Sequence, residues 1–267
     1  MSVRAVQIDR HGGPEVLQVR AVPVPTVRAG DVLVRTVASS LDPVDWKTRA
    51  WDRGPAFPMT LGSDLAGVVV QSTVAHFHTG DRVVAMSNQQ ASGIGTWADL
   101  VSLPAELLAP APTRAALTQA ATLPLAGLTA LQALTAMKLQ PTSRVLVAGA
   151  AGAVGALFVQ LAAHAGATVD GLVSRPGHVE PVRKLGAALV THDPAHLPRG
   201  TYRAVFDTAG LQRAGVEAGP LLGAGGRYVS ITDDPLPNIP EARGVQVREA
   251  HRRFEAGGLL GKVVLVF

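Results

Sequence analysis

The sequence predicts an α/β protein of two lobes: a β-rich N-terminal lobe, then a lobe built on a doubly wound parallel sheet. Residues 1–110 alternate short apolar runs with Gly, Pro and Asp turns, whereas the following region alternates strand and helix patterns. A small-residue turn at 144–155, RVLVAGAAGAVG, joins a strand to a helix in the second part. With 267 residues, the chain can form one large or two modest domains.

The N-terminal lobe is expected to contain five short strands, because Val, Leu and Ile recur between turn-forming residues. These strands are residues 3–8, 16–19, 32–39, 65–70 and 82–85. Turns are expected at Gly12-Gly13-Pro14, Ala29-Gly30-Asp31 and Thr79-Gly80-Asp81. The region that follows, 113–140, has a helical pattern, with a short helix near Ala120, a break at Pro124 and a second helix over 128–138.

The second lobe begins with the stretch 144–155, where an apolar strand runs into Gly149, Gly152 and Gly155 and then into a helix over 156–163. A strand, a tight glycine turn and a helix N-terminus together present backbone N–H groups to a diphosphate. A membrane segment is the alternative reading of this apolar region. It is disfavoured because the glycines cluster at one end and a strand–helix rhythm follows. Further strands are expected at 167–174, 188–191, 204–208 and 227–231, with a helix ending at 182–186.

Composition excludes several classes of chemistry. The chain contains no Cys, which rules out disulfides, four-Cys zinc sites and thiolate catalysis. The net charge of +4 comes from scattered Arg and few Lys, so nucleic acid is not an expected partner. The N-terminal residues lack the apolar core of a signal peptide, and we expect a cytoplasmic protein that does not bind a membrane.

A series of motifs runs in order along nearly the whole chain. They are HGGPEVLQV at 11–19, SSLDPVDWKTR at 39–49, LGSDLAGVV at 61–69, GDRV at 80–83, LPLAGLTALQAL at 123–134, RVLVAGAAGAVG at 144–155, FDTAG at 206–210, GGRYVSI at 225–231 and GKVVL at 261–265. Together they resemble the zinc-free quinone oxidoreductase branch of the medium-chain dehydrogenase/reductase superfamily. The resemblance implies a GroES-like lobe made of 1–113 and 248–267, a Rossmann lobe over 114–247, and NADPH bound between the lobes.

The resemblance bears directly on zinc. Zinc-dependent relatives use a Cys after the second long strand and a later Gly-His-Glu turn. Here these places read Ser39-Ser40-Leu41-Asp42 and Gly62-Ser63-Asp64, so a tetrahedral nitrogen and sulfur site cannot form there and no metal is expected. His76 and His78 share a strand face by spacing, but they lie in a polar stretch and are expected to be solvated.

The cofactor prediction rests on the end of the second strand of this lobe. NAD enzymes usually place Asp or Glu there to bind the ribose 2′-hydroxyl, whereas this strand ends in Ser174 and Arg175, which suit the 2′-phosphate of NADPH. Arg175 could instead be a surface charge, and His178 and Arg183 are weaker candidates. Asp170 falls in mid-strand and is expected at a solvated position or as a local hydrogen-bonding group.

The remaining candidates for cofactor binding follow from the glycine turn and from the resemblance. The turn contributes Gly149, Ala150, Ala151, Gly152, Ala153, Val154 and Gly155. The resemblance adds Asp207, Thr208, Ala209, Ser230 and Ile231 as groove residues, and Lys262 as either a cofactor contact or a solvated turn residue.

The resemblance implies hydride transfer from NADPH to a quinone or to the β-carbon of an enone. The candidate catalytic residues are Asp42, Trp46 and Thr129, with Thr129 near the nicotinamide and Trp46 as a wall beside it. Asp42 stands where the family has Asn, and an ionised carboxylate cannot donate a hydrogen bond. With a raised pKa, Asp42 would instead be a general acid; its alternative role is to cap the turn before Pro43.

A second departure concerns the C-terminal region, where only 244–247 could supply the sixth strand of the family and several tens of residues are missing. Because that strand belongs to the family's dimer interface, we expect a monomer or an altered homodimer. Two rival functions stay open. One is a biosynthetic tailoring reductase or cyclase acting on a polyketide-like enone, and the other is a non-catalytic NADPH-binding protein.

Overall fold

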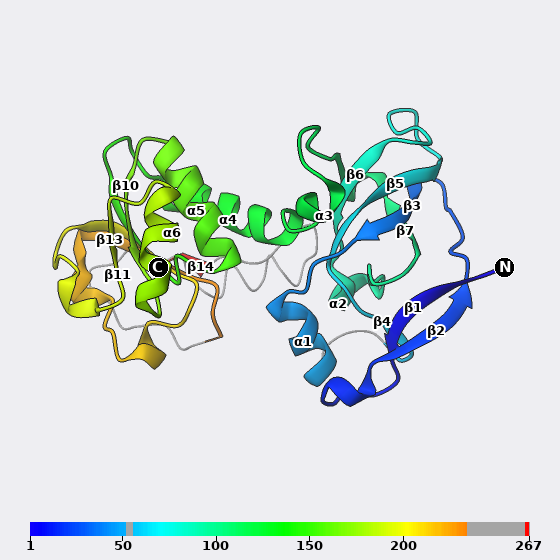
Figure 1. The fold of residues 1–267 in the computed structure, drawn as a ribbon, viewed down its shortest axis with the longest axis horizontal. Coiled ribbons are helices and arrows are strands. Elements are labelled where there is room, and N and C mark those ends of the chain that lie inside the picture. Colours follow the sequence, from blue (N-terminus) through cyan, green and yellow to red (C-terminus); the bar gives the residue numbers. More distant parts are fainter. Residues whose placement is uncertain (52–55, 234–264, 267) are drawn as a thin grey trace. The chain divides into compact units, whose positions relative to one another are not determined.

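The computed structural model describes residues 1–51, 56–233 and 265–266. The chain divides into two compact units, residues 1–125 and 126–267 (Figure 1). The first unit is mainly β-structure, whereas the second carries a parallel sheet with helices, which confirms the predicted fold class. The division falls at 125, later than the boundary expected at 113, because the short helix α3 (Leu117–Ala120) packs in the core of the first unit.

The first unit contains two sheets whose neighbouring strands are antiparallel. The three-stranded sheet has the order β2-β1-β4 and the five-stranded sheet has the order β7-β3-β5-β6-β8. The strands are β1 (Ser2–Ile8), β2 (Gln18–Pro23), β3 (Asp31–Ala38), β4 (Met59–Thr60), β5 (Asp64–Ser72), β6 (Arg82–Met86), β7 (Leu100–Pro104) and β8 (Leu108–Pro110). Alternate residues such as Val32 and Val34 on β3 pack with Leu65 and Val69 of β5, as a strand with one core-facing side requires.

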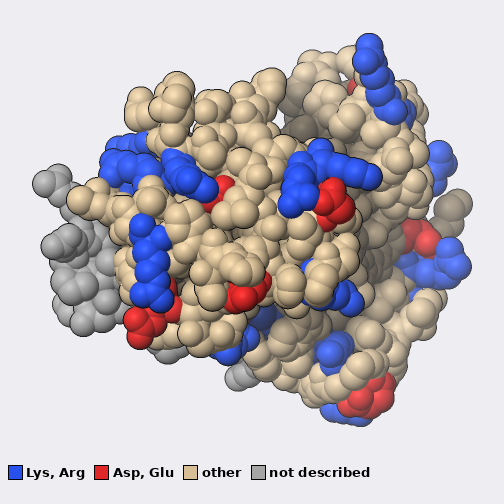
Figure 2. Space-filling view, turned by 60° about the vertical axis from the view of Figure 1, so that its left-hand side comes forward, with Lys and Arg blue, Asp and Glu red and all other residues tan. Residues whose placement is uncertain are grey.

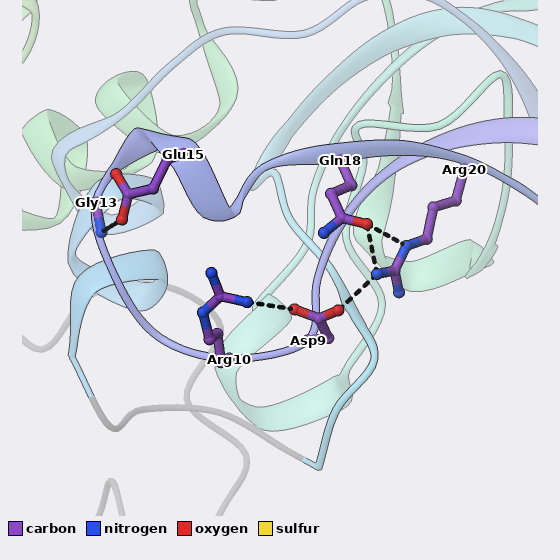
Figure 3. Close-up of polar contacts among 6 residues, drawn as sticks. All are labelled: Asp9, Arg10, Gly13, Glu15, Gln18 and Arg20. Carbon is purple, nitrogen blue, oxygen red and sulfur yellow. Dashed lines mark hydrogen bonds and ion pairs between the residues drawn. The ribbon is translucent and has the colours of Figure 1, made fainter.

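The loop between β1 and β2 is held by side chains at its two ends (Figure 3). Arg20 Nη2 lies 2.6 Å from Asp9 Oδ2 and donates to Gln18 Oε1, while Arg10 pairs with the second oxygen of Asp9. The hydrogen bond from Arg20 lowers the pKa of Asp9. Within the loop, the Glu15 carboxylate accepts the N–H of Gly13.

Helix α1 (Pro43–Ala50) was not predicted from the sequence. Its N-cap, Asp42, is extended, Pro43 occupies the first helical position, and Asp45 Oδ2 accepts the N–H of Asp42 at 2.7 Å. The unit also contains α2 (Gln89–Ser92) and the 3₁₀ helices η1 (Pro14–Val16) and η2 (Ala105–Leu107).

The linking helix α4 spans Pro124–Met137, so the second helix of this region begins four residues earlier than expected. Pro124 separates it from the preceding short helix, as predicted, and is itself the first residue of α4, where its missing N–H costs nothing. The earlier short helix near Ala120 is present as α3.

The second unit is built on a six-stranded sheet of order β11-β10-β9-β12-β13-β14. Its strands are β9 (Arg144–Ala148), β10 (Thr168–Leu172), β11 (Leu189–Thr191), β12 (Tyr202–Asp207), β13 (Leu222–Ser230) and β14 (Leu265–Val266). The first five are parallel, and the strand order reverses between β9 and β12. The sheet is therefore doubly wound, as predicted, and ligands of such sheets bind at this switch point.

Both faces of this sheet are buried. On one face, α4, α5 (Ala153–His164) and α6 (Val179–Lys184) pack through residues such as Ala133, Phe158 and Val182. On the other face, Leu146 and Tyr202 pack against the connections between strands. The connections on this face include the 3₁₀ helices η4 (Pro194–His196), η5 (Gln212–Ala214) and η6 (Gly219–Leu221), whereas η3 (Pro176–His178) leads directly into α6.

The C-terminal range 248–267 was expected to return to the first lobe. Its two described residues instead form β14, which pairs antiparallel with β13 through Val229 and Ser230 in the second unit. Residues 234–264 and 267 lie outside the described residues, and with them Lys262 and the expected sixth strand at 244–247. None of the described helices is both long and apolar enough to cross a membrane.

Candidate functional site

The turn between β9 and α5 has the shape that its glycines predicted. Gly149 has a φ of +77°, and a Cβ there would lie 2.5 Å from Thr208 Oγ1. A Cβ on Gly155 would collide with the carbonyl oxygen of Gly149, so only glycine lets α5 approach the turn this closely. Gly152 is the N-cap of α5, and the N–H groups of the first helical turn have no partner inside the helix.

The predicted turn residues divide into two groups by burial. Ala150 and Gly155 are buried, and the N–H groups of Gly149 and Ala150 both donate to the carbonyl of Leu172 on β10. These two residues fix the turn against the sheet. Ala151, Gly152 and Ala153 are exposed, and Val154 is half-buried. The exposed backbone of this second group is available to an anionic ligand.

A groove of about 660 Å³ opens at the carboxyl ends of the parallel strands. Its lining includes the predicted residues Gly149, Ala151, Gly152, Ser174, Thr208 and Ala209. The wall is completed by Ala148, Leu172, Val173, His178, His192, Pro194, Gly210, Leu211 and Ala214. Sequence reasoning missed His192, although it follows directly after β11 and the rule that ligands meet strand carboxyl ends could have found it.

Ser174 and Arg175 are both exposed just beyond β10. Arg175 does not itself line the groove, but its Nε donates to His178 Nε2 at 3.0 Å. That imidazole nitrogen is therefore an acceptor, and the ring proton belongs on Nδ1, which is buried with no hydrogen-bond partner among the described residues. Arg175 is therefore linked to the wall of the groove through His178, which was a weaker candidate for binding the 2′-phosphate.

Asp170 is fully buried, so its expected solvated position was wrong; its role as a local hydrogen-bonding group holds. One oxygen accepts from both Arg144 Nε and Tyr202 Oη at 2.8 Å. Burial and this carboxylate raise the pKa of Tyr202. Asp170 therefore ties β9, β10 and β12 together and does not face a ribose.

Asp207 shapes the loop after β12. Its carboxylate accepts the N–H groups of Ala209, Gly210 and Leu211 and, at 2.6 Å, the hydroxyl of Tyr228. The side chain is thus occupied within the protein, and it does not line the groove itself.

Three more predicted residues lie on the second unit. Thr129 is buried on α4. Ser230, at the end of β13, is buried and shares a hydrogen bond with the Thr232 hydroxyl, and the N–H of half-buried Ile231 donates to the carbonyl of Asp207. Neither Ser230 nor Ile231 lines the groove.

The first unit carries a second polar cluster, formed by residues that sequence reasoning did not group together. Ser40 lies between Asp42 and Asp64, with its Oγ 2.9 Å from Asp42 Oδ2 and 2.6 Å from Asp64 Oδ2. Burial raises the pKa of Asp64 to about 8, and the neighbouring Asp42 contributes in the same direction.

Asp45 lies on the other side of this cluster and is also buried. It accepts hydrogen bonds from Ser63 Oγ and Gln89 Nε2 as well as from the N–H of Asp42. Burial raises the pKa of Asp45, while these donors oppose the rise.

Trp46 is 42% exposed on α1. Its ring meets Trp51 edge to face at 5.4 Å, and Lys47 Nζ lies within 6.0 Å of both ring centres. Such an exposed aromatic pair offers a flat apolar surface beside a cation.

Among the described residues, no group of three or more His, Asp or Glu side chains is arranged to hold a metal ion. Lys and Arg side chains on the face shown in Figure 2 lie in separate groups, with acidic side chains beside several of them. The described residues of that face form no continuous basic stripe of the kind a nucleic acid requires.

Comparisons with known proteins agree with this architecture. Residues 28–113 match the alcohol dehydrogenase GroES-like domain. The chain is 37% identical over 254 residues to the chloroplast envelope quinone oxidoreductase homolog of Arabidopsis thaliana, covering 87% of this chain and 76% of that protein. It is 33% identical to the NADPH-dependent alkenal/one oxidoreductase of the same plant, covering 85% of this chain and 62% of the relative.

The solved quinone oxidoreductase of Coxiella burnetii superposes with a TM-score of 0.73 at 29% identity, over 85% of this chain and 74% of that structure. The glycine turn, the doubly wound sheet, the GroES-like unit and these relatives confirm the resemblance drawn from the motifs. The chain belongs to the quinone oxidoreductase branch of the medium-chain dehydrogenase/reductase superfamily and is an oxidoreductase.

Proposed function

We propose that this protein is a metal-independent reductase that uses NADPH to transfer a hydride to a quinone or an α,β-unsaturated ketone. The observation that carries the proposal is the groove at the β9–α5 turn, with Ser174 on its wall and Arg175 bonded to His178 of that wall. Bound NADPH would supply the hydride, and the protein would bind, orient and protect it.

The turn fits a dinucleotide on steric and electrostatic grounds. Gly152 is exposed at the N-terminus of α5, where unpaired N–H groups and the helix dipole favour a diphosphate. Gly149 lines the same groove and lacks the Cβ that would fill the space beside Thr208.

The preference for a phosphorylated ribose is supported by the residues that follow β10. An acidic residue at this place would accept a ribose hydroxyl and repel a phosphate, whereas Ser174 and Arg175 can donate to one. Asp170, the nearest carboxylate on the strand, is buried and bonded to Arg144 and Tyr202.

Metal independence is supported by the donor set. The positions of the zinc ligands in related enzymes carry hydroxyl and carboxyl groups, and Ser40, Ser63, Asp42 and Asp64 are engaged in hydrogen bonds within the first unit. An acceptor carbonyl would then be polarised by protein groups and by proton donation. Asp42 is the candidate proton donor, and it can act only when it is protonated. Trp46 would supply an apolar wall beside the acceptor.

The cofactor assignment predicts the effect of reversing one charge. Arg175→Asp should raise the Kd for NADPH by about 10- to 100-fold, because a charge-assisted hydrogen bond contributes about 1.5–3 kcal/mol. The Kd for NADH, which lacks the phosphate, should change little. Fluorescence titration of both nucleotides measures this, with Arg199→Asp, at an exposed position that does not line the groove, as the control for a general change of surface charge. Equal weakening of NADPH and NADH binding would contradict the assignment.

The reaction itself is tested by NADPH consumption with a simple quinone and a simple enone, after dialysis against a chelator. We expect turnover with at least one acceptor and no dependence on added Zn²⁺. Binding of NADPH without turnover of either acceptor would favour a non-catalytic binding protein.

A further inference from the structure

The Ser40 hydroxyl lies between two carboxyl groups. Because it has a single hydrogen, it limits which of these carboxyls can be ionised at the same time. Its Oγ is within hydrogen-bond distance of both Asp42 Oδ2 and Asp64 Oδ2. A hydroxyl has one hydrogen and can donate to only one of these oxygens. The other carboxyl must donate to Ser40, so one of the two carries a proton.

Geometry identifies Asp64 as the protonated partner. It has no exposed surface, whereas Asp42 is 7% exposed, and an isolated buried carboxylate is the costlier of the two to ionise. Asp64 Oδ1 accepts the N–H of Leu125 at 2.7 Å, which leaves Oδ2 to donate to Ser40. The raised pKa of Asp64, about 8, agrees with this assignment.

The groups around Asp42 and Asp64 disfavour the simultaneous ionisation of both carboxyls. The carboxyl of Asp42 faces Asp64 directly, and Asp45 lies beyond it, bonded to the N–H of Asp42. Besides Ser40 and the N–H of Leu125, the two carboxyls have each other as a side-chain hydrogen-bond partner, which also requires a proton on one of them, and no described Lys, Arg or His donates to either. Asp45 differs because three donors point at it, and each of them favours its ionised form and opposes the effect of burial.

We propose that Asp64, Ser40 and Asp42 form a proton chain, in which the proton held by Asp64 passes through Ser40 to Asp42 and completes the reduction. This proposal rests on the proposed function. Asp64 and Ser40 are positioning residues that act through Asp42, the outer member of the chain.

The protons and electrons balance as follows for an enone. The hydride brings two electrons and one hydrogen to the β-carbon, the carbon–carbon double bond becomes single, and an enolate is left. The Ser40 proton moves to Asp42, the Asp64 proton moves to Ser40, and Asp42 gives its proton to the enolate. Both carboxyls are then ionised, and one proton from water restores the resting state.

The shared proton can be detected without any turnover. Infrared spectra of the full chain at pH 7 should contain the carbonyl stretching band of a protonated carboxylic acid. This band should be lost in Asp64→Asn and should fade in the wild type as the pH is raised above about 8, the pKa of Asp64. If the difference spectrum between wild type and Asp64→Asn contains no such band at pH 7, the proton chain is refuted, whatever the enzyme reduces.

Its part in the reaction is tested with Ser40→Ala, which interrupts the chain and keeps both carboxyls. General acid catalysis typically contributes about 10²- to 10⁴-fold, so kcat should fall by at least about tenfold, with the Kd for NADPH unchanged. The pH profile and solvent isotope effect should change as well, and Ser40→Thr should restore them.

Ser63→Ala is the matched control, because it removes a neighbouring hydroxyl that bonds Asp45 and lies outside the chain. It should keep the wild-type pH profile. A wild-type pH profile and isotope effect in Ser40→Ala would overturn the proton chain. A wild-type enzyme that reduces neither acceptor would instead contradict the proposed function.

Discussion

Asp170 on β10 and Asp207 on β12 are both buried in one sheet, and their partners give them different roles. Asp170 joins Arg144 and Tyr202 and holds strands together, whereas Asp207 gathers three backbone N–H groups and the Tyr228 hydroxyl. The sequence places both residues correctly on strands. It could not reveal the tyrosine partners, which are 32 and 21 residues away along the chain.

Asp207 provides a prediction at the scale of single residues. Tyr228→Phe leaves the carboxylate with one donor fewer, and the free energy of unfolding should fall by about 1–2 kcal/mol. Because the loop that lines the groove loses an anchor, the Kd for NADPH should rise by roughly 3- to 10-fold. Urea unfolding and fluorescence titration measure the two effects.

Tyr202→Phe is the matched control, since it removes the corresponding donor from Asp170 at the opposite end of β12. Its unfolding free energy should fall similarly, without a change in NADPH affinity. If both variants bound NADPH as the wild type does, Asp207 would not position the groove.

At the scale of elements, the β9–α5 turn was the most predictable part of the molecule. Its glycines, its strand and its helix follow from local sequence, because each position has a steric requirement that only a small residue meets. Helix α1 was missed because Asp42-Pro43 was interpreted as a turn, although an N-cap followed by proline is also a helix start.

Two glycine-to-alanine substitutions, one on α5 and one on α4, should change the free energy of unfolding in opposite directions. Gly155→Ala places a Cβ against the carbonyl of Gly149 and should lower the free energy of unfolding by about 1–3 kcal/mol. Gly127→Ala, on α4, meets no described atom within 4 Å and should raise it by up to about 1 kcal/mol, because alanine favours a helix. Changes of the same sign in urea unfolding would contradict this packing.

On the scale of the whole molecule, the buried carboxyl cluster links stability to pH. Burial raises the pKa of Asp64 from 3.8 to about 8, so between these values the folded chain binds more protons than the unfolded chain. The free energy of unfolding therefore falls as pH rises through this window, by up to about 1.4 kcal/mol per pH unit.

Asp64→Asn removes this contribution. Its thermal midpoint should fall less steeply between pH 5 and 8 than that of the wild type. The lowered pKa values of exposed Asp9 and Asp99 act in the opposite sense at lower pH and are common to both proteins. Parallel pH curves for the two proteins would show that Asp64 is ionised in the folded state.

The buried carboxyl cluster could not be predicted from the sequence. Its members come from separate segments, namely the stretch 40–45, Ser63-Asp64, Gln89 and the N–H of Leu125. The motifs placed two of these segments at the zinc-ligand positions of relatives. Only the folded sheets bring all of them into one hydrogen-bond network, and no local pattern encodes that proximity.

The central claim, that a dinucleotide's diphosphate binds at the N-terminus of α5, is tested most directly by NADPH titration of the wild type, Gly152→Asn and Gly152→Asp. Gly152 has φ −75° and ψ 166°, and both Asn and Asp are good N-caps, so both variants should fold. We expect the wild type to bind NADPH, and Gly152→Asp to bind at least about tenfold more weakly than its neutral counterpart Gly152→Asn, because a carboxylate repels the phosphates. Equal affinity of the two variants, or a folded wild type that binds neither NADPH nor NADH, would contradict the account.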